Sequence, residues 1–159
     1  MFSQDFSEFD KKCMRIALDE AKLAYEEGNY PCGAVLTING EIVEKAHNLK
    51  EVRGDRISHA EMLLYINNSA KIKKAKKEGA TITMYTTLEP CLMCFGAAAI
   101  HRVDRIVAST PDPYGNMSAI KGDTLGSFYN QNLPKIEYGL FFDETYLLSI
   151  DYLQKKNDK

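Results

Sequence analysis

The sequence predicts an α/β fold in which a mixed, about five-stranded sheet is covered by helices. Segments with the 3.6-residue period of amphipathic helices alternate with short runs rich in β-branched and aromatic residues. The dipeptide Asn39-Gly40 separates two of these runs and favours a tight hairpin, so at least one strand pair is expected to be antiparallel. The element order is helix, hairpin, helix, strand, helix, strand, loop, strand, helix. This order is typical of one sheet with helices packed on it.

The first half of the chain begins with a helix. Ser7-Glu-Phe-Asp10 looks like a capping box, and apolar residues then recur at helical spacing until Gly28. Residues 48–58 are charged and predict a loop, after which a second helix is expected to begin near His59. The runs expected to form the hairpin strands are residues 33–38 and 41–46.

The second half contains a lysine-rich run at 71–78, and Gly79 follows it as a plausible helix stop. We interpret this run as a solvated helix face or connection, with an RNA contact as the alternative. The other expected elements are strands at 81–87, 105–109 and 135–141, a helix after Pro90, a loop at 111–115, and a helix at 143–154 followed by a frayed tail at 155–159.

Length and composition indicate one globular domain spanning residues 1–159. Hydrophobic residues make up 45% of the chain and charged residues 26%, which is ordinary for a globular protein. No apolar run approaches the roughly 20 residues that cross a bilayer, and the N-terminus lacks a secretory signal, so a cytoplasmic location is expected. A net charge of −2 provides no overall basic field for nucleic acid, which favours a small-molecule partner.

Two motifs point to a metal site. His59-Ala-Glu61 is expected at the start of one helix, and Pro90-Cys91-Leu-Met-Cys94 at the start of the next. Helix N-termini stabilise thiolates, and residues three apart share a helix face, so both cysteines can point at one ion. Two sulfurs and one imidazole nitrogen suit tetrahedral zinc, which predicts His59, Cys91 and Cys94 as ligands of one Zn²⁺ per chain.

The ligand count and the neighbouring carboxylate indicate catalysis. Three protein ligands and one open position are typical of a catalytic zinc, whereas a structural zinc is normally closed by four. Glu61 lies two residues from His59, so on a regular helix it points away from the shared metal and better serves as a proton carrier. The combined pattern H-x-E…P-C-x-x-C is typical of zinc-dependent nucleobase deaminases. A non-catalytic, zinc-stabilised binding module is the alternative from another class.

At these residues the chain resembles the cytidine and deoxycytidylate deaminase superfamily, from about Phe9 to Phe142. The stretch from Thr87 to His101 looks most like the branch of tRNA adenosine deaminases and guanine deaminases. The resemblance implies a three-layer α/β/α sandwich of the cytidine deaminase-like type, zinc on the three predicted ligands, Glu61 as proton shuttle, and a homodimer. It also implies that Asn48 contacts the base, although local turn hydrogen bonds are an equally simple role for an asparagine there.

The sequence leaves two classes of substrate open. Our first interpretation is hydrolytic deamination of a purine or pyrimidine base, nucleoside, nucleotide or related heterocycle, with release of ammonia. Adenosine-to-inosine deamination of tRNA is the alternative. Arg56-Ile57-Ser58 departs from the Pro-Thr-Ala that tRNA-acting members carry, whereas Asp112-Pro-Tyr-Gly115 resembles a loop of that branch. Glu89 is a second candidate acid, for which a loop-fixing role is the simpler explanation.

Overall fold

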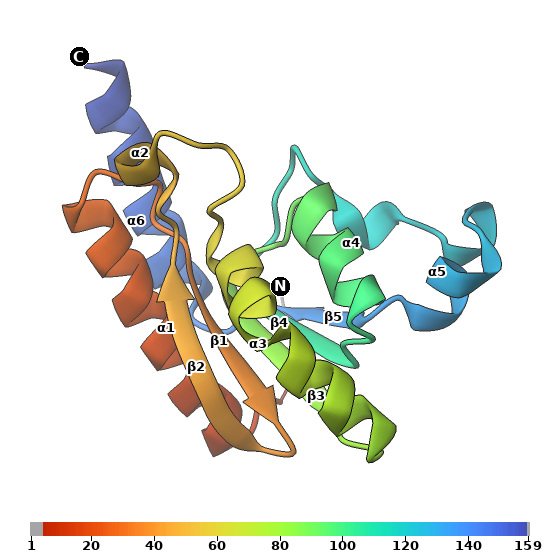
Figure 1. Ribbon diagram of the computed structural model, residues 1–159. Coiled ribbons are helices and arrows are strands. Elements are labelled where there is room, and N and C mark those ends of the chain that lie inside the picture. The colour runs from red at the N-terminus through yellow and green to blue at the C-terminus, as the bar shows by residue number, and fades with distance from the viewer. Residues whose placement is uncertain (1–4, 159) are drawn as a thin grey trace.

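The computed structural model describes residues 5–158 and contains a five-stranded mixed sheet with helices on both faces (Figure 1). The strands are arranged in the order β2-β1-β3-β4-β5. β1 pairs antiparallel with β2 and β3, whereas β3, β4 and β5 are parallel to one another. The predicted mixed, five-stranded sheet is therefore confirmed. The strands are β1 (Gly33–Ile38), β2 (Glu41–His47), β3 (Ile82–Leu88), β4 (Arg105–Thr110) and β5 (Lys135–Tyr138).

Side chains of the central strands point alternately to the two faces of the sheet, and each face carries a hydrophobic core. Ala34 and Leu36 of β1 belong to the cluster that contains α3 (Ala60–Lys77) and α4 (Leu92–Ile100), whereas Val35 belongs to the cluster that contains α1 (Glu8–Glu26). Because successive strand residues point to opposite faces, a strand buried on both sides reads as a continuous apolar run. Helix α6 (Phe142–Asn157) contacts α1 and β4. The result is a three-layer α/β/α arrangement, as expected.

Local chemistry explains how α1 begins and how β1 packs on it. Ser7 and Asp10 form a reciprocal capping box, which confirms the predicted helix start. At Gly33, an added Cβ would lie 2.0 Å from the backbone oxygen of Ala17, so only glycine allows this close approach of β1 to α1. In the hairpin turn, Asn39 and Gly40 both have positive φ angles, as a type I′ turn requires.

Helices α3 and α4 begin at the same edge of the sheet. His59 is the N-cap of α3, and Cys91 is the N-cap of α4, which follows β3 after the Glu89-Pro90 step. The lysine-rich run forms the last turns of α3, and Gly79, with a φ of 78°, follows the helix end. Since the N-terminal ends of both helices face one another, the predicted zinc ligands lie close together in space.

Several elements differ from the expectation. The predicted loop at 48–58 contains a single helical turn, α2 (Lys50–Arg53), and the connection between β4 and β5 contains α5 (Ser127–Asn132) and two short 3-10 turns. The last strand ends at Tyr138 rather than residue 141, because positive φ angles at Gly139 and Phe141 turn the chain into α6. The two 3-10 turns are η1 (Met117–Ala119) and η2 (Gly122–Thr124).

The C-terminal helix is longer than predicted. α6 continues to Asn157, three residues beyond the expected end at Gln154, and fraying of residues 155–159 stays a prediction. Across residues 5–158, no helix has both the length and the apolar character that a membrane span requires.

Candidate active site

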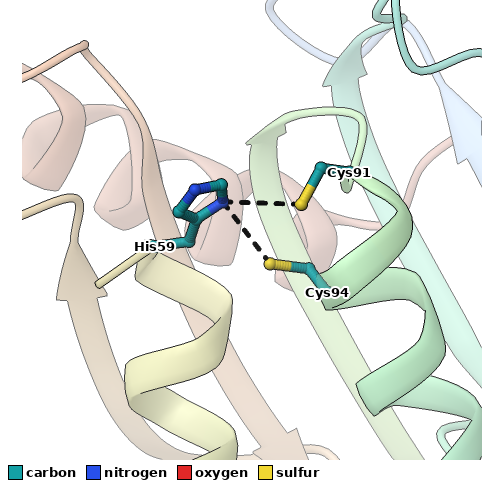
Figure 2. A group of neighbouring side chains, drawn as sticks. All are labelled: His59, Cys91 and Cys94. Atoms are coloured by element: carbon teal, nitrogen blue, oxygen red, sulfur yellow. Dashed lines mark hydrogen bonds between the residues drawn. The ribbon is translucent and has the colours of Figure 1, made fainter. Parts of the chain in front are cut away.

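The three predicted metal ligands meet between the first turns of α3 and α4 (Figure 2). The Nδ1 atom of His59 lies 3.5 Å from Sγ of Cys91 and 3.7 Å from Sγ of Cys94. All three donor atoms lie within 4.8 Å of one another. Cys91 is the N-cap of α4 and Cys94 lies in its first turn, so the helix geometry itself turns both sulfurs toward His59.

These separations fit a tetrahedral zinc site. With a Zn–N bond of about 2.1 Å and Zn–S bonds of about 2.3 Å, a tetrahedral angle places nitrogen and sulfur ligands about 3.6 Å apart. The observed nitrogen-to-sulfur distances of 3.5 and 3.7 Å bracket that value. One imidazole nitrogen and two thiolate sulfurs also form the donor set that zinc prefers. Within residues 5–158, no further histidine, cysteine or carboxylate joins this group.

Charge at the site favours metal binding. The hydrogen bond from Cys94, together with His59, lowers the pKa of the Cys91 thiol to about 3, so Cys91 is a thiolate. The same hydrogen bond to Cys91 and burial raise the pKa of the Cys94 thiol. Because zinc binds thiolates, zinc binding must release the proton that the two cysteines share. The helix N-terminus helps to hold the resulting negative charge.

Glu61 is buried beside the three donors without being one of them. Its side chain is 3% exposed, and its Oε1 accepts a 2.9 Å hydrogen bond from the Thr86 hydroxyl. Its Oε2 lies 3.8 Å from Sγ of Cys94. Burial raises the pKa of the Glu61 carboxyl, because the charged form loses solvation in the interior. A carboxyl with a raised pKa, next to a metal site, is suited to taking up and releasing a proton.

A cavity of about 270 Å³ is lined by His59, Cys91 and Glu61. Asn48 lines it, but both ends of its amide are engaged: Nδ2 donates to the Tyr30 carbonyl and Oδ1 accepts from the Lys50 amide. The side chain thus fixes a local turn at the cavity wall and keeps one further amide hydrogen on Nδ2. Its contact with a base stays a prediction.

Three further residues that line the cavity were not predicted from the sequence. Tyr30 and Lys50 come from the segments on either side of the β-hairpin, and Leu153 comes from α6. Lys50 lies two residues after Asn48, so proximity to a predicted binding residue is a signal that could have indicated it. No local signal marks Leu153, because only the packing of α6 brings it to the cavity.

Glu89 holds the loop that forms another wall of the cavity. Its buried carboxylate accepts hydrogen bonds from the backbone amides of Asp112 and Ser118, at 2.7 and 2.9 Å, and from the Tyr138 hydroxyl at 2.8 Å. With both oxygens engaged, Glu89 fixes this loop, which agrees with the simpler of its two explanations. Tyr114, at the loop tip, lines the cavity and is 98% exposed.

Comparison with known proteins identifies the family. Residues 7–110 match the cytidine and deoxycytidylate deaminase zinc-binding region, which covers both motifs and all three donors. The chain belongs to this deaminase family. The zinc-binding region and the His59, Cys91 and Cys94 triad together confirm the predicted zinc cofactor.

Within the deaminase family, the similar proteins include tRNA-specific adenosine deaminases. The tRNA-specific adenosine deaminase of Bacillus subtilis is 47% identical over 109 residues, which are 69% of this chain and 66% of that protein. The corresponding protein of Aquifex aeolicus is 39% identical over 99 residues, which are 62% of this chain and 64% of that protein. The match therefore spans slightly less than two thirds of these relatives' own lengths.

Solved structures confirm the fold. A structure from studies of A-to-I editing by tRNA:A34 deaminases has a TM-score of 0.63 and 28% identity, and the alignment covers 86% of this chain and 98% of that chain. The guanine deaminase of Nitrosomonas europaea has a TM-score of 0.63 at 17% identity, covering 89% of this chain and 83% of that chain. At that identity the likeness concerns the fold alone.

Proposed function

We propose that this chain is a zinc-dependent hydrolytic deaminase that converts adenosine to inosine in tRNA. The observation that carries the proposal is the His59, Cys91 and Cys94 triad with the buried Glu61 carboxyl beside it, next to a cavity that includes Glu61 in its lining. The relatives at 39 to 47% identity are described as tRNA-specific adenosine deaminases. They favour tRNA over the small-molecule substrate that the sequence alone placed first.

Glu61 carries the proton in this mechanism. A zinc ion held by His59, Cys91 and Cys94 would supply the Lewis acidity that activates water. The water oxygen adds to C6 of adenine, and Glu61 takes the proton that the water loses and delivers it to the ring nitrogen. A second proton then passes from the C6 hydroxyl through Glu61 to the amino nitrogen, and the C6–N6 bond breaks as the C6 carbonyl forms and ammonia leaves. One water is consumed for each inosine formed. Thr86 donates to Glu61 Oε1 and keeps the carboxyl oriented during these transfers.

The cavity suits one base rather than a larger ligand. Its volume of about 270 Å³ is at the low end for ligand pockets, which usually measure about 300–1,000 Å³. A base turned out of an RNA loop fits such a pocket, while the rest of the polynucleotide stays outside. Both Tyr114 and Asn48 line the cavity, so we propose that Tyr114 stacks on the base and that the second Nδ2 hydrogen of Asn48 contacts its edge.

The non-catalytic alternative has less support. A structural zinc site normally has four protein ligands, whereas the donor group among residues 5–158 has three. Moreover, a buried carboxyl beside the metal is costly unless it is used or paired, and Thr86 and Cys94 pair it only in part. An open position facing a cavity is what a hydrolytic enzyme needs.

The deciding experiment measures ammonia release by the zinc-loaded full chain. The substrates are an unmodified tRNA transcript, adenosine, adenosine monophosphate, guanine, cytosine, and representative pterins and triazines. Inosine formation in tRNA, with little activity on free compounds, is the expected result. Activity on one small compound and none on tRNA would support the first interpretation, deamination of a small molecule. No activity with any of them would favour the binding module.

We also propose that the protein acts as a homodimer. Helices α3 and α4 contact one another and expose the large apolar side chains of Ile66 and Leu92, which are 61% and 66% exposed. Burial of such side chains between two copies is favourable. Light scattering coupled to size-exclusion chromatography would measure the mass, and a mass of about 18 kDa would contradict the dimer.

The cysteine chemistry supports a cytoplasmic location. All four cysteines are free thiols, and Cys91 and Cys94 must be reduced to bind zinc. A reducing compartment that contains tRNA satisfies both requirements.

A further inference from the structure

A second cavity, of about 400 Å³, lies at the opposite ends of α3 and α4 from the zinc site. Its walls come from the last turns of α3, the end of α4 and the first turn of α5, and α4 contacts both other helices (Figure 1). Its lining includes lysines from the lysine-rich run, to which the proposed mechanism assigns no role. We call it the basic pocket, and its charged and aromatic lining residues are Lys73, Lys76, Lys77, His101, Arg102 and Phe128.

The basic pocket has a surplus of positive charge. Lys76 is neutralised by Asp104, at 2.9 Å. Lys73, Lys77 and Arg102 have no acidic partner among residues 5–158. The carboxyl ends of α3 and α4 each contribute about half a negative charge, which offsets about one of the three free cations. The remaining positive charge is concentrated in a concave surface, although the whole chain carries a net charge of −2.

An aromatic side chain lies beside these cations. Phe128 of α5 is 41% exposed, and the guanidinium of Arg102 lies 6.0 Å from its ring centroid. On the inner side, His101 stacks on Tyr65 and bonds to Ser69 and to the Ala97 carbonyl, so its ring is held in place. Cations interleaved with an exposed aromatic ring form the kind of surface that binds a nucleic-acid backbone and an unstacked base.

We propose that the basic pocket binds the sugar–phosphate backbone of the RNA substrate, away from the reacting base. The inference rests on the proposed tRNA function and adds a second contact for the same substrate. Helix α4 connects the two sites: it begins after Cys91 and ends at Ile100, which spans about 14 Å at 1.5 Å per residue. A folded RNA bridges that distance, whereas a free base or nucleoside does not. The basic pocket therefore contributes to the affinity for tRNA and does not take part in the chemical step.

Two double variants on α3 test this with a matched control. Lys73→Ala/Lys77→Ala removes two free cations from the basic pocket. Lys71→Ala/Lys74→Ala removes the same charge from the same helix, but these two side chains line a different hollow beside Glu41 and Glu78. Alanine favours helix, so both variants should fold. The affinity of each zinc-loaded full chain for an unmodified tRNA transcript is measured by fluorescence anisotropy at several salt concentrations.

We expect the pocket variant to bind tRNA at least about tenfold more weakly, and the control to bind like the parent protein. The slope of log affinity against log salt should fall in magnitude by roughly 0.7 to 0.9 for each lost phosphate contact. The turnover number with saturating tRNA should stay unchanged while KM rises, because the basic pocket is remote from Glu61. Arg102→Asn should act in the same direction, since asparagine tolerates the positive φ of 54° at that position.

The experiment distinguishes failure of the pocket's proposed role from failure of the proposed tRNA function. If the parent protein binds and deaminates tRNA, but the pocket variant binds with unchanged affinity and slope, the basic pocket has no such role and the proposed function stands. Equal weakening by both double variants would indicate a general charge effect and would also overturn the inference. If the parent protein neither binds nor deaminates tRNA, the proposed function fails together with the inference.

Discussion

At the scale of single residues, Glu61 separates catalysis from metal binding. Its carboxyl lies beside the triad but is not among the donor atoms that lie within 4.8 Å of one another. Glu61→Gln keeps the shape and the hydrogen bond from Thr86 but removes the group that can carry a proton. We expect turnover to fall by roughly 10²- to 10⁴-fold, the range for general acid–base catalysis, while one zinc per chain is retained. Ammonia release and metal analysis on the same preparation measure both; unchanged turnover would remove Glu61 from the mechanism.

Cys94 and Cys32 provide a matched pair for the ligand assignment. Both are buried near the cavity, but Cys94 belongs to the donor group and Cys32 instead lies 3.8 Å from the Thr86 hydroxyl. Cys94→Ser should lose most of its zinc, because serine is a poor substitute for a thiolate ligand. Cys32→Ser should keep one zinc per chain. Metal analysis after dialysis gives the answer, and full zinc occupancy in Cys94→Ser would contradict the assignment.

Motif spacing predicted the three residues that come together as a donor group, because each motif is local. His59 and Glu61 share one helix start, and Cys91 and Cys94 share another, so helix geometry alone indicates which side chains can point together. Leu153 could not be found this way. It reaches the cavity only through the packing of α6, which depends on contacts between residues far apart in the sequence.

At the scale of elements, Glu89 connects the start of α4 to the loop over the cavity. Three donors point at its carboxylate, and an amide would present only one oxygen to them. In Glu89→Gln, at least one donor therefore faces an NH₂ group, which costs roughly 1–3 kcal/mol. We expect KM to rise more than the turnover number falls, and proteolysis within residues 111–118 to become faster. Tyr138→Phe removes only one donor and should have a smaller effect; an unaltered KM in Glu89→Gln would show that the loop does not depend on this carboxylate.

A second buried carboxylate links α1 to the sheet. Burial by itself would raise the pKa of Asp10, but hydrogen bonds from Arg105, Tyr85 and the Ser7 amide lower it to about 2, from an ordinary value of 3.8. Arg105 belongs to β4 and also pairs with Glu137 of β5. A depressed pKa in the folded state stabilises the protein above the unfolded pKa, and that contribution is lost as pH falls through the folded value.

For Asp10 this window lies between about pH 4 and pH 2, and the contribution is roughly 2 kcal/mol. Asp10→Asn should therefore lower the free energy of unfolding at pH 7 by about that amount and should flatten its dependence on pH between 4 and 2. Urea titrations at several pH values measure this. Asp19→Asn, which changes an exposed carboxylate of the same helix, is the control. Parallel pH profiles for Asp10→Asn and the parent protein would contradict the prediction.

The regular elements were predictable where periodicity and turn chemistry agree. The Asn39-Gly40 hairpin and the Ser7 capping box have signals within a few residues, and both formed as expected. Helix α5 and the 3-10 turns η1 and η2 were missed, because this polar connection contains no apolar period. Its short turns depend on contacts with the rest of the protein, such as the hydrogen bond from the Ser118 amide to Glu89.

At the scale of the whole molecule, the net charge does not describe how charge is distributed over the surface. A net charge of −2 favoured a small substrate, yet the fold gathers Lys73, Lys77 and Arg102 into one concave surface. The two lysines lie in the same helix, but Arg102 joins them only because α4 ends beside α3. Composition sums charge over the chain, whereas binding depends on where the fold puts it.

The relation between zinc and stability also belongs to this scale. The hydrophobic clusters on the two faces of the sheet contain no zinc ligand, and the triad lies at the helix starts. Removing zinc should therefore leave the fold intact at 25 °C, unlike a zinc finger, which unfolds without its metal. A metal that binds only the folded state at about 1,000 times its Kd adds about 4 kcal/mol, so a chelator should lower Tm by roughly 10 °C. Circular dichroism during a thermal scan, with and without chelator, measures this. Loss of helical signal at 25 °C on chelation would mean that zinc holds the fold together, and the triad would then be as much structural as catalytic.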